Sequence, residues 1–201
     1  MTSSLPAGLR ERKKARTRAA IRGAAMRLFD AQGYAATTVD QIAEAAEVSQ
    51  STFFRYFPTK EDVVLTDEYD PAIVAAMRAQ PAGMHPVDVF LAAVLEVYGN
   101  LGPAEVEAEM QRQRLFLEVP ELRARMMHQT VTSIDMLAEV IAERAGRQSG
   151  DVQSKVLAGA IVGAVLAVAP MGRGYDFEPR NLGDMRMALT QLRAGFPDLA
   201  P

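Results

Sequence analysis

The 201-residue sequence predicts an all-α protein built from two parts, and three observations support this prediction. Apolar residues recur at helical spacing along most of the chain, while no stretch of useful length alternates as a β-strand does. Proline and glycine punctuate the helical segments. Charge also divides the chain, since residues 1–66 carry 10 Lys and Arg against 7 Asp and Glu, whereas residues 67–201 carry 12 against 18. We expect about nine helices, in a basic domain over residues 1–66 and an acidic domain over residues 67–201.

The first helix is expected to begin near Leu9, after a flexible lead-in over residues 1–8. Its apolar residues follow the i, i+3, i+4, i+7 spacing of one helix face. They are Ile21, Ala24, Ala25, Leu28 and Phe29. Gly33 fits the position at which such a helix ends. This helix should bury its apolar face under the segment that follows and hold that segment rigid.

Residues 37–60 have the pattern of a helix-turn-helix, and the rest of the chain is organised around it. Thr38 and Gln41 form a capping-box pattern, which predicts a short helix that begins directly after Thr38. A tight turn follows, and Ser49 is a good N-cap for a second helix over residues 50–56. Two short helices joined in this way are the arrangement that places the second helix in a DNA groove.

A third helix is expected after Pro58, because Pro58 ends the second helix and Thr59 can cap the next one. Lys60 would then lie in a first helical turn, where the helix dipole favours anions over cations. A nearby phosphate would remove this conflict. We therefore expect Lys60 to contact a DNA phosphate.

Residues 33–64 resemble the DNA-binding domain of TetR-type transcriptional repressors, since they read GYAATTVDQIAEAAEVSQSTFFRYFPTKEDVV. The shared pattern consists of a glycine, a threonine pair, isoleucine-alanine, valine-serine, threonine-aromatic, tyrosine-phenylalanine and threonine-lysine-glutamate. The resemblance covers about the first third of the chain. It implies that the helix over residues 50–56 enters the major groove of double-stranded DNA.

The side chains of that helix that the core does not need have the chemistry of DNA recognition. Glutamine bonds adenine, arginine bonds guanine or phosphate, and phenylalanine contacts the thymine methyl group. Arg55 can therefore address a base or a phosphate. By family position, the resemblance implies base-edge contacts from Gln50, Ser51 and Phe54, and phosphate contacts from Thr38, Thr52, Tyr56 and Lys60. Phe54 stands where many relatives have tyrosine, so a hydroxyl contact to phosphate is absent there, and Phe53 and Phe57 are expected in the core.

Positive charge is concentrated before the helix-turn-helix, where residues 10–27 hold eight basic residues and one acid. One interpretation of such a run is a solvated helix face. Next to a helix-turn-helix, it favours contact with phosphates. Residues 10–18 have the composition of an arm that becomes ordered on contact with DNA.

A proline separates the two domains. The helix that continues from Lys60 must break at Pro71, with Asp70 as the N-cap of the helix that restarts, so we expect a joint there. Further helices are expected over residues 72–78, 87–101, 104–118, 120–145, 151–169 and 179–194.

An effector pocket among these helices is implied by the family resemblance. The candidate lining residues are apolar or aromatic and recur at helical spacing. They are Met77, Phe90, Val94, Tyr98, Phe116, Met126 and Ile134. Such rows form protein core more often than pocket walls, but methionine also suits adaptable ligand sites.

Five basic side chains flank those rows and are either solvated or placed to meet an anionic head group. They are Arg112, Arg114, Arg123, Arg125 and His128. Residues 114–127, RLFLEVPELRARMM, resemble the subgroup that includes the mycofactocin-system regulator, whose effectors are acyl-coenzyme A thioesters. A fatty acyl-coenzyme A is therefore the effector that the resemblance implies.

Residues 156–172 carry no charge and are rich in alanine and glycine. A membrane-spanning helix does not fit, because Pro170 interrupts the run and small residues occupy much of it. Small residues permit close helix approach, so we expect a buried homodimer interface formed with the last helix. Its candidate residues are Gly159, Ala160, Gly163, Ala164, Ala167, Leu189 and Leu192.

Composition argues against a metal or redox site. The chain has no cysteine and two isolated histidines, so we expect no disulfide, no metal centre and no cofactor. No spacing suggests a catalytic constellation, and no apolar run suggests a signal peptide, so we expect a cytoplasmic regulator. Two alternatives remain: a helical protein or enzyme that binds acyl groups without a DNA-binding role, and a purely architectural DNA-binding protein.

Overall fold

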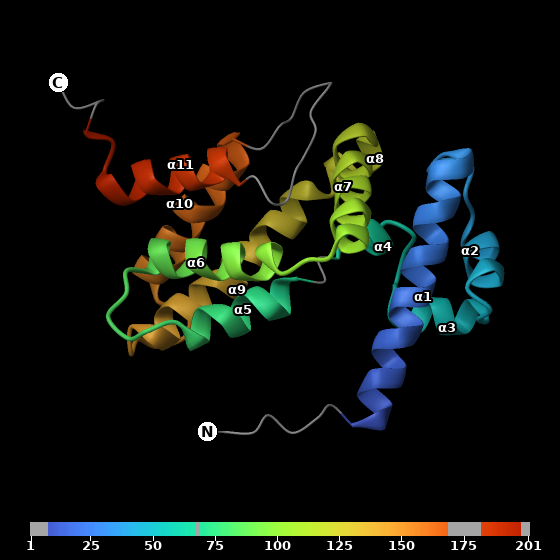
Figure 1. The fold of residues 1–201 in the computed structure, drawn as a ribbon, viewed down its shortest axis with the longest axis horizontal. Helices are drawn as coiled ribbons and strands as arrows, with labels where there is room; N and C mark the ends of the chain where they lie inside the picture. The colour runs from blue at the N-terminus through green and yellow to red at the C-terminus, as the bar shows by residue number, and fades with distance from the viewer. Residues whose placement is uncertain (1–7, 67–68, 169–181, 198–201) are drawn as a thin grey trace. The chain divides into compact units, whose positions relative to one another are not determined.

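The computed structural model describes residues 8–66, 69–168 and 182–197, and the chain in these ranges is helical and contains no strand (Figure 1). The predicted all-α class is confirmed. The chain divides into two compact units, Met1–Thr66 and Asp67–Pro201.

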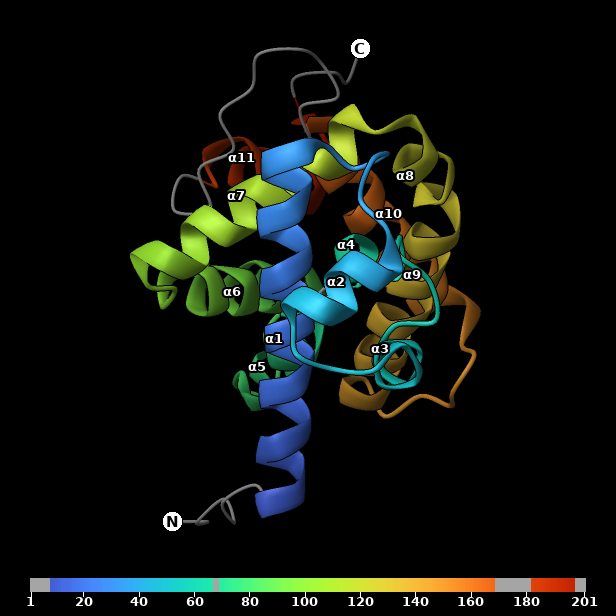
Figure 2. The same ribbon diagram turned by 90° about the vertical axis from the view of Figure 1, so that its right-hand side faces the viewer.

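Residues 8–66 of the first unit form four helices: α1 (Leu9–Gln32), α2 (Val39–Ala45), α3 (Gln50–Tyr56) and α4 (Asp62–Leu65). Helix α2 lies against α1 and α3, and α4 also contacts α1 (Figure 2). Their shared core consists of fully buried apolar and aromatic side chains, including Ile21, Ala24, Ile42, Phe53, Phe57 and Val63. This core fixes α3 relative to α1, as the apolar stripe of the first helix predicted.

Helix α1 begins at Leu9, as predicted, and continues without a break to Gln32. The basic segment 10–18 is therefore already helical without DNA, and the expectation of an arm that becomes ordered on contact is wrong. Burial of α1 starts at Ile21 in the described part of the helix, so the preceding turns extend beyond the core. Helix formation there needs no burial because the segment continues a helix that is already nucleated.

The predicted caps of α2 and α3 are confirmed. The Thr38 hydroxyl accepts a hydrogen bond from the Gln41 N–H at 3.3 Å, and the Gln41 side chain accepts one from the Thr38 N–H at 2.9 Å. The Ser49 hydroxyl accepts from the Thr52 N–H at 3.1 Å. These contacts satisfy backbone donors that a helix start leaves without partners, so both helices begin where the sequence predicts.

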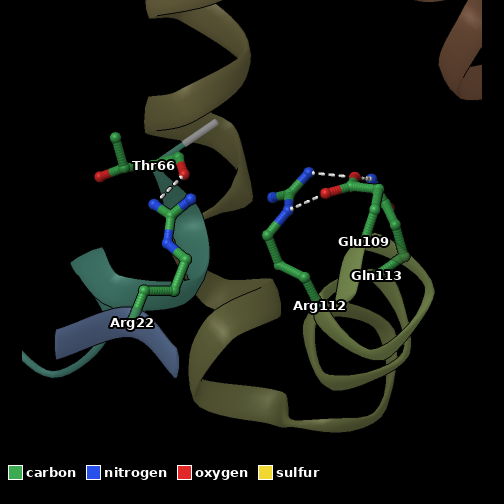
Figure 3. A network of polar contacts seen from close by, with 5 residues as sticks. All are labelled: Arg22, Thr66, Glu109, Arg112 and Gln113. Atoms are coloured by element: carbon green, nitrogen blue, oxygen red, sulfur yellow. Dashed lines mark hydrogen bonds and ion pairs between the residues drawn. The ribbon is translucent and has the colours of Figure 1, made fainter. Parts of the chain in front are cut away.

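Helix α4 is shorter than predicted. It ends at Leu65, where Arg22 donates a hydrogen bond to the Thr66 carbonyl at 2.7 Å (Figure 3). The helix therefore ends before Pro71 is reached. The next helix, α5 (Asp70–Ala79), has Tyr69 rather than Asp70 as its N-cap. Pro71 occupies the first turn of α5, where a missing N–H removes no helical hydrogen bond.

The second unit contains seven helices within its described residues: α5, α6 (Pro86–Gly99), α7 (Pro103–Glu118), α8 (Pro120–Ala124), α9 (Met126–Arg144), α10 (Val152–Val168) and α11 (Gly183–Ala194). Helix α10 packs against α9 and α11, and α5 packs against α6 and α9. The helix predicted over residues 120–145 is broken at Arg125, which separates α8 from α9. The predicted start of the last helix at residue 179 lies outside the described residues.

Helix α5 is anchored at its C-terminal end by α9. The Arg144 guanidinium donates hydrogen bonds to the carbonyls of Met77 (2.9 Å), Gln80 (2.9 Å) and Pro81 (2.7 Å). Arg78 adds an ion pair with Glu143 at 2.9 Å. A cation at this end also suits the helix dipole, so α5 is held firmly where it meets the following loop.

Across the described ranges, no single helix is both long and apolar enough to span a membrane. Among the described helices, α6 and residues 103–115 of α7 would together be long and apolar enough, but this pair is bent by 117°.

Candidate DNA-binding face and effector cavity

Helix α3 presents a chemically mixed face that its own core does not use. Phe53 is fully buried, whereas the next residue, Phe54, has 49% of its surface exposed. Gln50, Ser51 and Arg55 are also exposed, and with Phe54 they occupy positions i, i+1, i+4 and i+5 of one helix face. The structure thus brings together the three predicted base-contacting residues and Arg55. An amide, a hydroxyl, an aromatic ring and a guanidinium can together address base edges and phosphates.

The residues predicted to contact phosphate lie at the edges of this face. Thr52 and Tyr56 are half-buried on α3, and Thr38 is exposed at the start of α2. The Thr38 hydroxyl already serves as the α2 cap and donates to the Gln41 side-chain oxygen at 3.3 Å, so a phosphate contact would have to replace or share that donor. Arg55 lies over the Tyr56 ring, with 5.4 Å between the guanidinium carbon and the ring centroid.

Lys60 differs from the other predicted phosphate contacts because its ammonium group has partners within the protein. Its Nζ atom donates hydrogen bonds to the carbonyls of Tyr34 at 2.9 Å and Thr37 at 3.0 Å. It also lies 4.1 Å from the centroid of the Tyr34 ring. The prediction that Lys60 lies in the first turn of the next helix is wrong, because α4 begins at Asp62 and Lys60 lies in the turn before it, directed at these carbonyls.

The basic residues of α1 fall into two groups. Arg18 and Arg22 lie over the buried Phe57 ring, at 4.7 Å and 5.8 Å from its centroid, and therefore contribute to the fold. The remaining six are exposed: Arg10, Arg12, Lys13, Lys14, Arg16 and Arg27. Only this second group has the accessibility that phosphate contacts require.

The second unit contains a partly open cavity of about 210 Å³. Its walls come from α5, α6, α9, α10 and α11, and most of the side chains are aliphatic or aromatic. The lining residues are Asp70, Ile73, Val74, Met77, Phe90, Val94, Tyr98, Ser133, Met136, Leu137, Val162, Val165, Leu166 and Met185. Asp70, Tyr98 and Ser133 supply the polar groups, and a few polar groups in an apolar wall are typical of small-molecule sites.

Four of the seven predicted pocket residues line this cavity: Met77, Phe90, Val94 and Tyr98. Ile134 does not line it and packs against the hydrophobic core, while its neighbours Ser133, Met136 and Leu137 face the cavity. The side chains of Phe116 and Met126 lie outside the described part of the structure.

Sequence reasoning missed several lining residues that share a simple signal. Asp70, Ile73, Val74 and Met77 fall at i, i+3, i+4 and i+7, which is one face of α5. A search for the full stripe containing Met77 would have identified them.

The predicted head-group cations have different environments. Arg112 is buried and bonded through two nitrogens to Glu109, at 2.6 Å and 2.8 Å, and Gln113 donates to the same carboxylate at 2.8 Å (Figure 3). Its charge is therefore largely balanced by that carboxylate. Arg114, Arg123, Arg125 and His128 are exposed.

Helix α10 carries an exposed apolar stripe along much of its length. Val152 and Val156 have 73% and 67% of their surface exposed, and Gly163 and Ala167 are exposed on the same face. A Cβ atom added at Gly159 or Gly163 would meet nothing within 4 Å. The close approach that these glycines permit is thus not used within one chain.

The predicted contribution of α11 to a dimer interface needs correction. Leu189 is fully buried within a single chain and has no surface left for a partner, and Leu192 packs against the same core. Met187, with 56% of its surface exposed, is the large apolar side chain that α11 offers instead.

Comparison with known proteins decides the family. Residues 21–66 match the model described as bacterial regulatory proteins of the tetR family, and residues 84–197 match the MftR C-terminal domain. The chain belongs to the TetR family. This TetR-family regulator is 41% identical to the transcriptional regulator TcmR of Streptomyces glaucescens over 146 residues, which cover 69% of its own chain and 65% of TcmR. It therefore spans slightly less than two thirds of that relative.

Two further proteins are similar to this TetR-family regulator. The Mycobacterium tuberculosis protein MftR is 26% identical over 158 residues, which cover 78% of this chain and 79% of MftR. The Thermus thermophilus repressor FadR, solved with lauroyl-CoA, is 25% identical with a TM-score of 0.51, and the match covers 92% of this chain and 98% of FadR. These proteins are named as transcriptional regulators, and none of these names supports the alternative of an acyl-group enzyme or carrier without a DNA-binding role.

Proposed function

We propose that this TetR-family regulator is a homodimeric repressor that binds a pseudo-palindromic operator and releases it when a small apolar effector occupies the cavity. The observation that carries the proposal is the exposed face of α3, where Phe54 lies in solvent beside a fully buried Phe53. An exposed aromatic ring among polar side chains on a rigid helix is favourable for reading base edges.

The DNA-binding proposal can be tested by a gel shift with the DNA upstream of the protein's own gene. Gln50→Ala should weaken binding and relax base preference at one position, by about 1–3 kcal/mol for the preferred base. Tyr56→Phe removes only a hydroxyl at the edge of the face and should weaken binding to all sequences alike. If Gln50→Ala changed neither affinity nor preference, this face of α3 would not read bases.

The homodimer is proposed because a two-fold pair of α3 helices must enter successive major grooves, about 34–36 Å apart. The exposed apolar stripe of α10 supports a self-complementary interface across such an axis. Regulators of this family bind DNA as dimers and respond to small-molecule ligands.

The size of the cavity supports a compact apolar effector. A dry cavity of about 150 Å³ is enough to hold benzene, and pockets for drug-sized ligands begin near 300 Å³. The cavity of about 210 Å³ lies between these values and suits a molecule of one or two rings, or part of an alkyl chain. Val94→Phe should fill it and abolish the release of operator by effector while leaving operator binding intact.

A fatty acyl-coenzyme A is the narrower candidate for the effector. The likeness to FadR, which was solved with lauroyl-CoA, supports it. The described lining contains no Lys or Arg, so it would hold the acyl chain rather than the phosphates. Comparing lauroyl-CoA with dodecanol in a thermal-shift assay tests this, because equal stabilisation by both would show that the coenzyme A part is not recognised.

The coupling between effector binding and operator release can be tested by measuring it in both directions. An effector releases operator only if it binds better to the DNA-free state, and a coupling of about 1–3 kcal/mol is typical. Effector affinity should fall in the presence of operator by the same factor by which effector weakens operator binding. Equal effector affinity with and without operator would refute the switch.

A further inference from the structure

Lys60 reaches from the turn before α4 to the corner between α1 and α2. Its Nζ atom bonds the carbonyls of Tyr34 and Thr37, which are 26 and 23 residues away in the sequence. An ammonium group has three hydrogen-bond donors, so two of them are used within the protein. The family pattern implies a phosphate contact for this lysine, and the geometry indicates an additional role.

The corner that Lys60 contacts is also held by neutral hydrogen bonds, including one from the Gln32 side chain to the Thr37 hydroxyl at 3.2 Å and one from the Thr37 N–H to the Tyr34 carbonyl at 3.3 Å. It begins at Gly33, with φ of 87°, and ends at Thr38, the N-cap of α2. Thr37 is buried, and its hydroxyl donates to the Gly33 carbonyl at 2.9 Å. Hydrogen bonds from a charged donor are stronger than these neutral ones, so an ammonium group shared by two corner carbonyls favours one conformation.

The turn that carries Lys60 is itself fixed. The Asp62 carboxylate accepts hydrogen bonds from the Thr59 N–H and from the Thr59 hydroxyl, each at 2.8 Å. The Tyr34 ring adds a cation–π contact with the ammonium group and packs against the Phe29 ring in a tilted arrangement, with 5.0 Å between ring centroids. The lysine therefore joins two fixed parts of the first unit.

We propose that Lys60 is a positioning residue that holds the α1–α2 corner, and with it Thr38, in the conformation that binds DNA. Two of the three N–H donors of Lys60 are used at the corner, so the residue acts on DNA binding through the corner rather than through a phosphate contact. This inference rests on the proposed DNA-binding function.

Amide hydrogen exchange without DNA tests the corner directly. Lys60→Met keeps the apolar stem and removes the ammonium group, so exchange should increase over residues 34–41. Arg55→Met is the matched control, because it removes an exposed cation of α3 whose aromatic contact is with the Tyr56 ring, 5.4 Å away, and it should leave that exchange unchanged. Lys60→Arg keeps the charge and the donors and should restore exchange close to the wild-type rate. Far-UV circular dichroism confirms that each variant is folded.

The salt dependence of operator binding separates positioning from direct contact. Lys60→Met should lower operator affinity about tenfold or more, as expected for lost charge-assisted hydrogen bonds, without changing the slope of log K against log salt concentration. A lost phosphate contact would instead reduce the slope by about one, with unchanged exchange, and that result would overturn the proposal. Increased exchange with unchanged affinity would also overturn it. If the wild type bound no operator, the proposed function would fail, while the exchange result would still decide whether Lys60 holds the corner.

Discussion

Phe53 and Phe54 are adjacent on α3, with their rings 5.4 Å apart and nearly perpendicular, yet Phe53 is fully buried and Phe54 is 49% exposed. Phe53→Ala should therefore destabilise the protein by about 3–5 kcal/mol, as large-to-small core substitutions do. Phe54→Ala should leave the free energy of unfolding nearly unchanged and weaken operator binding. Urea denaturation and fluorescence anisotropy on both variants measure the two effects. Strong destabilisation by Phe54→Ala would show that this ring belongs to the core.

The basic turns of α1 that precede Ile21 should add to DNA affinity as a preformed helix. Lys13→Gln combined with Lys14→Gln keeps helix propensity and removes two exposed charges, so the salt slope of operator binding should fall by up to about 2. Arg114→Gln combined with Arg123→Gln makes the same charge change in the second unit and should leave the slope unchanged. An unaltered slope in the Lys13 and Lys14 variant would show that these turns only contribute solubility.

The exposed stripe of α10 should form the dimer interface. Val156→Arg places a charge on the stripe and should shift the protein toward monomer in analytical ultracentrifugation, because an unpaired charge at an interface is strongly unfavourable. Val131→Arg is the matched control, since Val131 is 47% exposed on α9. A stable wild-type monomer at micromolar concentration would contradict the interface.

A glycine on the same stripe gives an independent check on the interface. Gly163→Ala should stabilise an isolated chain by about 1 kcal/mol through helix propensity, because a Cβ there meets open space. Gly163→Leu should weaken the dimer instead, since overpacking costs about 1–3 kcal/mol. If Gly163→Leu left dimerisation unchanged, a partner would not approach at this point.

Asp151 should stabilise the start of α10 in a pH-dependent way. Hydrogen bonds from the backbone N–H and hydroxyl of Ser154, each at 2.8 Å, lower the pKa of Asp151 below its ordinary value of 3.8, and Arg147 acts in the same direction. Because the pKa is depressed in the folded state, this stabilisation is present above pH 3.8 and is lost as the pH falls through the depressed pKa. Asp151→Asn retains a capping oxygen but does not titrate. The difference in the free energy of unfolding between wild type and this variant should shrink below pH 3.8, and a difference independent of pH would contradict the assignment.

Local signals in the sequence predicted the first unit well. The caps at Thr38 and Ser49 depend on residues three positions apart, so the sequence alone identifies them. The partners of Lys60 depend on how the chain folds back over more than 20 residues, and no local pattern reports that. The same reasoning explains why α4 is shorter than predicted, since Arg22 binds its last turn from α1.

Only part of the cavity lining was predicted. Helical periodicity gives the spacing of residues on a helix face but not the direction in which that face points. Ile134 and Ser133 are one position apart, and only the packing of α9 against its neighbours decides which of them faces the cavity. Leu189 illustrates the same limit, because an apolar residue suits a subunit core and a subunit interface equally well.

The Arg144 contacts have a mechanical consequence for α5. Because α5 is ten residues long and is held at its C-terminal end, its motion would be a rotation about a point near Met77 and Gln80. The opposite end carries Asp70 and Ile73, which line the cavity, and it follows Thr66 by only a few residues in the chain. An effector that contacts Asp70 or Ile73 would push on the N-terminal end of α5, which also contacts α6 through the Tyr69 and Tyr98 rings, and the displacement would be largest where the chain leads back to the first unit. Arg144→Met removes these hydrogen bonds. It should therefore leave effector binding intact but weaken the release of operator by effector.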